Sequence, residues 1–168
     1  MSTQVDIQEL AQVAPKGCLP KELVSNTAFL LARVGVAIKL AAADELEKLG
    51  CGLYDYGVLA TLGEGTQETQ AAVADALGLD RSMLVGILDS LEENGLVERK
   101  RDPNDRRRHT VSITTKGKRR LVELREVTSE IEQTFLEPLD ERTRKQLHEA
   151  LLRIACAYDP RYVVGAGK

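Results

Sequence analysis

With 168 residues, 43% of them hydrophobic and 29% charged, the chain is too apolar to be disordered and too short for two full-sized domains. The formal net charge of −3 argues against a nucleic-acid partner until its distribution is considered. Between Arg99 and Arg125 there are eleven basic and three acidic residues, so this segment has a charge of +8 and the rest of the chain has a charge of −11. Such a distribution attracts phosphate at one place only.

The chain begins with a polar arm, residues 1–19, and continues into a predicted helix over 20–49 that is rich in Ala, Leu and Val. The arm has early acids and lacks a basic region followed by an apolar one, so it differs from a secretory signal. Arg33 and Lys39 interrupt the most apolar part of the helix, which is therefore too polar to span a membrane. Gly50 ends the helix, and these features favour a cytoplasmic protein.

Three shorter helices are predicted in the middle of the chain. The first covers 54–62 and is followed by a GEGT loop with two glycines. The second covers 69–77, where Gly78 breaks it. Asp80 then offers its carboxylate as the N-cap of the third helix, which ends before Gly95.

A two-stranded hairpin follows, with LVERKR and HTVSIT as its strands and DPNDRRR as its turn. Val111 and Ile113 alternate with polar neighbours, as in a half-buried strand. Pro103 and Asn104 are typical turn residues. The hairpin therefore carries three consecutive arginines, 106–108, at its tip.

The C-terminal third is predicted to form two more helices with surplus apolar surface. Pro138 ends the first helix, and Asp140 can cap the second. Apolar residues recur every three or four positions on each helix, at Leu121, Leu124, Val127, Ile131 and Phe135 and at Leu147, Ala150, Leu151, Ile154 and Tyr158. So small a central domain cannot cover both faces, and we expect a second chain to cover them.

Ala74, Gly78 and Leu84 match three positions of a helix-turn-helix. The two helices cross closely, so the motif needs a small residue at the crossing, a flexible one in the turn and an aliphatic one that points back. A recognition helix fits the major groove of DNA, and a thin ribbon with arginines can reach the adjacent minor groove. The pattern therefore predicts a winged helix-turn-helix that binds double-stranded DNA.

The stretch LGLDRSMLVGILDSLEENGLVERKRDPNDRRRHTVSITTKG resembles the signature of the MarR family of transcriptional regulators. The DPxDRR wing, the Gly-Leu-Val before it and the Thr-x-x-Gly after it carry the resemblance, which extends over residues 22–157. It implies a mainly α fold with a small β-hairpin wing, in which a winged helix-turn-helix is flanked by long dimerisation helices. It also implies a homodimer on a palindromic operator, acting as a repressor, or less often an activator, that a small ligand releases.

With this resemblance, the chain divides into an arm (1–19), a helical dimerisation region (20–53 and 116–158), a DNA-binding domain (54–115) and a C-terminal tail (159–168). The ligand would be a small aromatic or apolar acid in a cleft between the first helices and the winged domain. Arg33, Tyr54 and Tyr56 lie in the right region of the sequence, with core packing as the alternative role of the tyrosines. No cofactor is expected, and no Cys or His has a second ligand residue at metal-binding spacing.

The resemblance also assigns roles in the wing. It implies that Arg107 enters the minor groove and that Arg106 and Arg108 contact phosphates. Asp105 would hold a wing arginine through a charge-assisted hydrogen bond.

On the predicted recognition helix, Arg81 and Ser82 lie near the N-terminus, where the helix dipole suits phosphates and base edges. Helix capping is an equally weighted role for Ser82. Gln70 would contact the DNA backbone, and Val85 a thymine methyl group. Gly86 departs from the family pattern, which often has an arginine in the middle of this helix.

Three other functions compete with DNA-binding regulation controlled by a ligand. An enzyme is disfavoured because the sequence has no phosphate loop, nucleophile elbow or metalloprotease motif. A winged helix used only for protein contacts shares the apolar pattern but has little need for three consecutive arginines. A redox-sensing regulator would use one of the widely separated Cys18, Cys51 and Cys156, whose reactivity depends on thiol pKa and exposure.

Overall fold

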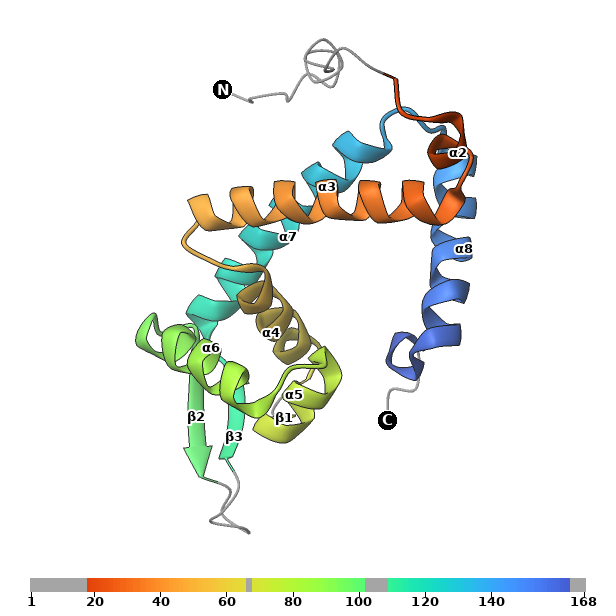
Figure 1. Cartoon of the computed structure of the whole chain (residues 1–168). Coiled ribbons are helices and arrows are strands. Elements are labelled where there is room, and N and C mark those ends of the chain that lie inside the picture. The colour runs from red at the N-terminus through yellow and green to blue at the C-terminus, as the bar shows by residue number, and fades with distance from the viewer. Residues whose placement is uncertain (1–17, 66–67, 102–108, 164–168) are drawn as a thin grey trace.

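The computed structural model describes residues 18–65, 68–101 and 109–163 (Figure 1). The predicted roles of the first 17 residues, of the wing residues Asp105, Arg106, Arg107 and Arg108, and of the last five residues lie outside the described part. The elements are α2 (Lys21–Val24), α3 (Thr27–Lys48), α4 (Leu53–Glu64), β1 (Glu68–Thr69), α5 (Gln70–Leu77), α6 (Arg81–Glu93), β2 (Val97–Arg101), β3 (His109–Ile113), α7 (Thr115–Leu136), α8 (Glu141–Tyr158) and the 3-10 turn η1 (Pro160–Tyr162). The predicted fold class, mainly α with a small β-hairpin wing, is confirmed.

The single helix predicted over 20–49 is wrong at its start, because the structure divides it into α2 and α3. Ser25 Oγ donates to the Lys21 carbonyl at 2.8 Å, which closes α2. The Asn26 side chain then accepts a hydrogen bond from Phe29 N at 3.0 Å and begins α3 as its N-cap. Short polar side chains compete for backbone hydrogen bonds in this way, so a helical composition alone does not secure a continuous helix. The predicted stop at Gly50, which has φ +68°, is confirmed.

Helix α4 is longer than predicted, since it continues to Glu64 and takes up part of the GEGT segment. A Cβ atom at Gly63 would lie 2.6 Å from Leu121 Cδ2 of α7. This glycine therefore lets α4 and α7 pack closely and does not begin a loop.

Helices α4, α5 and α6 and the three-stranded sheet form a compact unit that we call the winged head (Figure 1). The sheet order is β1-β3-β2 and both pairings are antiparallel, with Val97 opposite Ile113 and Arg101 opposite His109. The fully buried side chains come from α3, the winged head and α7: Leu46, Val58, Leu59, Leu62, Val73, Leu84, Leu88, Leu91, Val97, Val111 and Leu124. One core thus fixes α5, α6 and the hairpin relative to one another.

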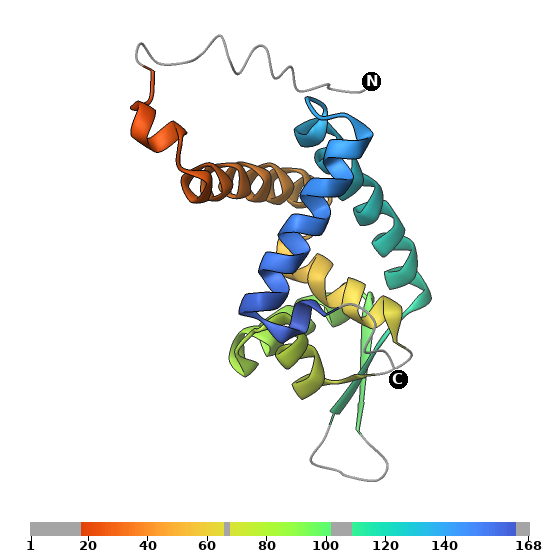
Figure 2. The ribbon, with the colours of Figure 1, turned by 90° about the vertical axis from the view of Figure 1, so that its right-hand side faces the viewer.

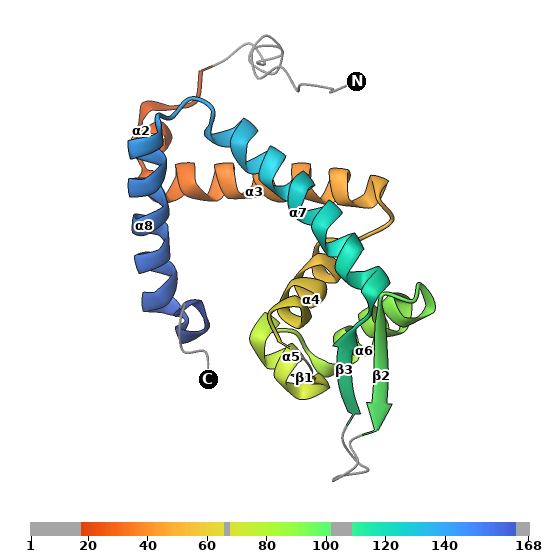
Figure 3. The same cartoon turned by 180° about the vertical axis from the view of Figure 1, so that it is seen from behind.

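Helix α7 leads from the winged head to the turn before α8, and α8 returns from there toward the level of the head (Figure 2 and Figure 3). Asp140 caps α8 as predicted, accepting from Thr143 N at 2.8 Å. No residue of α8 is buried, and the predicted apolar face is exposed at Leu151, Ile154 and Tyr158. In the described ranges, none of the helices is long and apolar enough to cross a membrane.

Candidate nucleic-acid interface

The two helices of the helix-turn-helix begin at side-chain caps. The Thr69 hydroxyl accepts from Ala72 N at 3.1 Å at the start of α5, and Asp80 Oδ1 accepts from Met83 N at 2.8 Å at the start of α6. Between them, Gly78 adopts the left-handed conformation with φ +64°, which favours glycine. The predicted turn and the predicted Asp80 cap are confirmed.

Ser82 takes part in the cap of α6. Its Oγ donates to Asp80 Oδ1 at 2.5 Å. The hydrogen bonds from the Ser82 hydroxyl and from Met83 N hold the pKa of the Asp80 carboxyl below its ordinary value. The capping role proposed for Ser82 thus has a geometric basis, and its hydroxyl oxygen still has an acceptor site for DNA.

A groove of about 650 Å³ runs between the N-terminal turns of α5 and α6 and the first residue of β3. Three of the predicted contact residues, Gln70, Arg81 and Val85, line it together. Arg81 and Val85 are exposed, and the wider lining consists of Thr69, Ala71, Ala72, Asp75, Leu84 and His109. The fold therefore brings residues from two helices and the hairpin to one exposed surface.

His109 is a groove residue that the sequence reasoning missed. It begins β3 and pairs with Arg101 across the hairpin. Its position directly after the three wing arginines was the available signal, because the strand must start where the wing turn ends.

The structure also contains a short strand, β1, that the sequence analysis did not predict. Glu68 pairs with Val111 and Thr69 pairs with Thr110. Thr69 is at once the last residue of β1 and the N-cap of α5, so this pairing ties the start of α5 to the hairpin. Two residues are too few to show an alternating pattern, so this strand could not be predicted from periodicity.

Arg99 links the hairpin to α6. Its Nε and Nη2 donate to Glu92 Oε2 at 2.9 and 2.6 Å, and its backbone N donates to Glu92 Oε1 at 2.9 Å. Its Nη1 forms an ion pair with Asp89 Oδ1 at 2.7 Å. The hydrogen bonds from the Arg99 side chain and backbone lower the pKa of the Glu92 carboxyl. We call Arg99, Glu92 and Asp89 the wing clamp, because they fix β2 against the recognition helix.

We expect Glu92→Gln to lower the free energy of unfolding by about 1 kcal/mol at neutral pH, a value reduced for the partial exposure of the pair. The folded-state pKa of Glu92 is depressed, so its contribution is present above the unfolded pKa and is lost as pH falls through the folded pKa. Urea unfolding at neutral pH and at an acidic pH should therefore show a difference between wild type and Glu92→Gln that becomes smaller in acid. Glu93→Gln, on the exposed neighbour, is the control; an equal loss at both pH values would contradict the ionic role.

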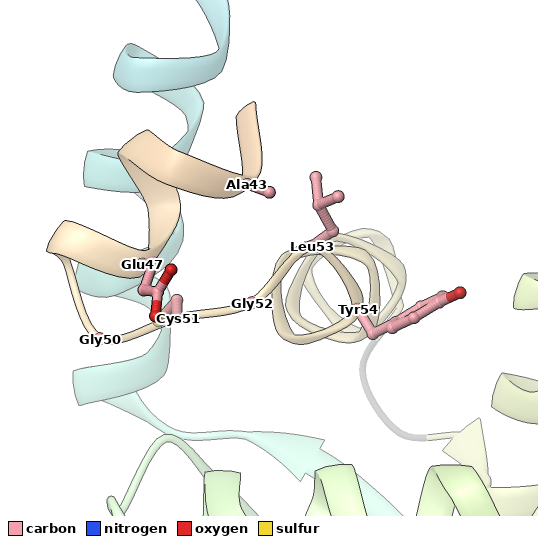
Figure 4. Close-up of a pocket in the computed structure, with 7 residues that line it drawn as sticks. All are labelled: Ala43, Glu47, Gly50, Cys51, Gly52, Leu53 and Tyr54. Atoms are coloured by element: carbon pink, nitrogen blue, oxygen red, sulfur yellow. The ribbon is translucent and has the colours of Figure 1, made fainter. Parts of the chain in front are cut away.

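A separate pocket of about 510 Å³ lies at the junction of α3 and α4 (Figure 4). Ala43 and Glu47 come from α3, Leu53 and Tyr54 come from α4, and the linker contributes Gly50, Cys51 and Gly52. Of the predicted ligand residues, only Tyr54 lines this pocket. Arg33 is exposed elsewhere on α3, and the Tyr56 hydroxyl lies 3.5 Å from Thr128 Oγ1, between α4 and α7. The three residues are therefore not brought to one site.

The cysteines differ in environment. Cys51 is buried, and burial raises the pKa of its thiol, which disfavours the reactive thiolate. Cys156 is half-buried and its Sγ lies 3.3 Å from the Tyr162 carbonyl oxygen, while Cys18 is exposed. All three thiols are free, and the buried Cys51 is the least suited of them to redox sensing.

Comparison with known proteins agrees with this geometry. The family model described as the MarR family matches residues 55–109. A transcriptional regulatory protein for the hcr operon of Thauera aromatica is 32% identical over 99 residues, which is 59% of this chain. The aligned part spans 60% of that relative's own length.

Solved structures match over more of the chain. A MarR-family transcriptional regulator from Rhodococcus sp. RHA1 is 31% identical with a TM-score of 0.71, covering 81% of this chain and 96% of that one. The repressor CouR bound to a 23-mer DNA duplex is 28% identical with a TM-score of 0.75, covering 83% and 99%. CouR from Rhodococcus jostii RHA1 bound to p-coumaroyl-CoA is 29% identical with a TM-score of 0.69, covering 81% and 96%. The chain belongs to the MarR family.

Proposed function

We propose that this chain is a cytoplasmic, non-enzymatic transcriptional regulator that binds a palindromic operator as a homodimer and is released by a small ligand. The observation that carries the proposal is the groove in which Gln70, Arg81 and Val85 meet at the exposed end of the helix-turn-helix. The similarity to CouR bound to a DNA duplex, at a TM-score of 0.75, supports the same face as the DNA-binding face.

The groove has the chemistry that duplex DNA requires. The N-terminus of α6 carries the positive end of the helix dipole, and Arg81 adds a full positive charge at its first helical residue. Gln70 begins α5 on the opposite side of the groove, where its amide can contact the DNA backbone. Val85 is exposed one turn along α6 and offers methyl groups to thymine. Arg106, Arg107 and Arg108 would extend this contact from the wing.

The dimer is proposed from apolar surface outside the winged head. A single chain exposes large apolar side chains on three helices, at Leu23, Val24, Leu30, Leu31, Val34, Val36, Leu40, Leu151, Ile154 and Tyr158. A water-exposed apolar surface over α2, α3 and α8 is costly for a monomer, and a second copy with the same surface can cover it. We therefore assign dimerisation to residues 20–53 and 116–158.

The ligand is proposed to place its apolar or aromatic part in the pocket between α3 and α4. CouR binds p-coumaroyl-CoA, which carries an aromatic ring. The pocket here is lined by Leu53 and Tyr54 but also by Glu47, without a basic side chain among its lining residues. This lining suits an aromatic group better than the carboxylate of an acid, because Glu47 would repel the carboxylate. Occupancy would change the angle between the dimerisation helices and α4.

The test is to incubate the purified chain with genomic fragments and to sequence the retained DNA. We expect enrichment of one palindromic motif and an affinity for it that falls steeply with salt, together with a mass in light scattering twice the chain mass of 18.5 kDa. A regulator that acts only through protein contacts would show neither enrichment nor salt-dependent retention. A monomer at micromolar concentration would contradict the dimer independently of the DNA result.

A further inference from the structure

The turn η1, which follows α8, contacts the winged head through the side chain of Arg161. Arg161 Nη1, from η1, donates to the backbone carbonyl of Asp75 in α5 at 3.2 Å. Within residues 18–65, 68–101 and 109–163, this is the one hydrogen bond that joins α8 or η1 to the winged head. The Asp75 carbonyl lies in the last turn of α5, where its backbone partner is Gly78 N at a long 3.3 Å and where the helix dipole favours a positive charge.

Gly78 provides the space for this contact. Its φ of +64° makes the turn between α5 and α6, and the guanidinium of Arg161 lies directly against it. A Cβ atom at Gly78 would overlap Arg161 Nη1 and lie 3.0 Å from Cζ. The same residue thus permits the helix-turn-helix and the approach of the C-terminal arginine.

The guanidinium is also fixed to α8. Asp159, the C-cap of α8, accepts from Arg161 Nε at 2.9 and 2.8 Å and from Nη2 at 2.5 Å. Its Oδ1 accepts from Arg161 N at 3.0 Å, and its own backbone N donates to the Ala155 carbonyl at 2.9 Å. A bidentate carboxylate of this kind orients a guanidinium strongly. Movement of the end of α8 must therefore move the group that holds α5.

We propose that Arg161 is a positioning residue that couples α8, part of the dimerisation region, to the orientation of the helix-turn-helix. Helix α6 follows Gly78 after two residues, so displacement of the α5–α6 turn displaces the recognition helix as well. The coupling gives a ligand or a partner subunit that shifts α8 a direct way to change DNA affinity. The predicted effect of this coupling on DNA affinity rests on the proposed function, whereas the contact between Arg161 and α5 can be measured without DNA.

The first experiment measures operator affinity of the dimer for Arg161→Ala and Asp159→Asn. Loss of the coupling should weaken binding by about 2- to 30-fold in both variants. Asp159→Asn distinguishes coupling from simple electrostatics. It removes a negative charge, so electrostatics alone would strengthen DNA binding, whereas loss of the coupling would weaken it. Arg153→Ala is the matched control, since Arg153 lies on α8 and its Nε donates to Glu149 O of the same helix. Weakening by Arg161→Ala together with tightening by Asp159→Asn would show a direct phosphate contact and overturn the proposal.

The second experiment measures hydrogen exchange of the dimer without DNA. We expect faster exchange in residues 74–79 of Arg161→Ala and of Asp159→Asn than in wild type or Arg153→Ala, because the end of α5 loses its partner. Unchanged exchange in both variants would overturn the coupling even if the chain binds DNA. If the wild-type chain fails to bind DNA, the proposed function is wrong, and the exchange result still decides whether Arg161 holds the helix-turn-helix.

Discussion

Gly117→Ala is expected to destabilise the protein by about 3 kcal/mol or more. Gly117 is buried in the first turn of α7, and a Cβ atom there would overlap the carbonyl oxygen of Leu96 and lie 2.8 Å from Ile113 Cγ1. The Leu96 carbonyl cannot move aside easily, because it accepts from Thr114 N at 3.0 Å and belongs to the chain that enters β2. Equilibrium unfolding in urea measures the loss.

The chain offers a control with the same chemical change. A Cβ atom at Gly86, in the exposed part of α6, meets nothing within 4 Å, so Gly86→Ala should stabilise the helix by about 1 kcal/mol. The two substitutions should therefore differ in sign. If Gly117→Ala unfolded at the same urea concentration as the wild type, the side chain added at this position would cost nothing. The close approach of α7 to the start of β2 would then not be the reason for glycine in the Thr-x-x-Gly motif.

Arg81→Ala is expected to weaken operator binding by about 1–3 kcal/mol for each subunit that contacts DNA, so that a symmetric dimer loses up to twice that amount. Arg81 is the first residue of α6, is exposed and lines the groove beside Gln70 and Val85. Because truncation removes no buried contact, the unfolding free energy should change by less than about 0.5 kcal/mol. Titration of labelled operator at two salt concentrations is the measurement.

Lys48→Ala is the matched control for the loss of one positive charge. Lys48 ends α3, far along the chain from the groove, and forms exposed ion pairs with Asp44 and Glu45. A charge effect spread over the whole molecule would give equal losses in the two variants. A loss confined to Arg81→Ala, with a smaller salt slope if the guanidinium meets phosphate, would assign the effect to the groove.

The sequence by itself determined the features that depend on neighbouring residues. The Asp80 cap, the left-handed Gly78 and the helix-turn-helix spacing follow from contacts within a few positions, where local chemistry decides the backbone. The β2–β3 hairpin follows from the alternating pattern of two strands that are neighbours in the sequence. The family resemblance rests on the same local pattern. It also indicated that Gln70, Arg81 and Val85 share a role, and the fold brings these three side chains to one groove.

Only the tertiary structure decided the features that join distant parts of the chain. The β1–β3 pairing, the close contacts of Gly63 with Leu121 and of Gly117 with Leu96, and the ion pairs of Arg99 with α6 depend on which elements meet in space. The contact of Arg161 with Asp75 spans 86 positions. No periodicity or cap signals such contacts, because the packing of the core decides which elements meet.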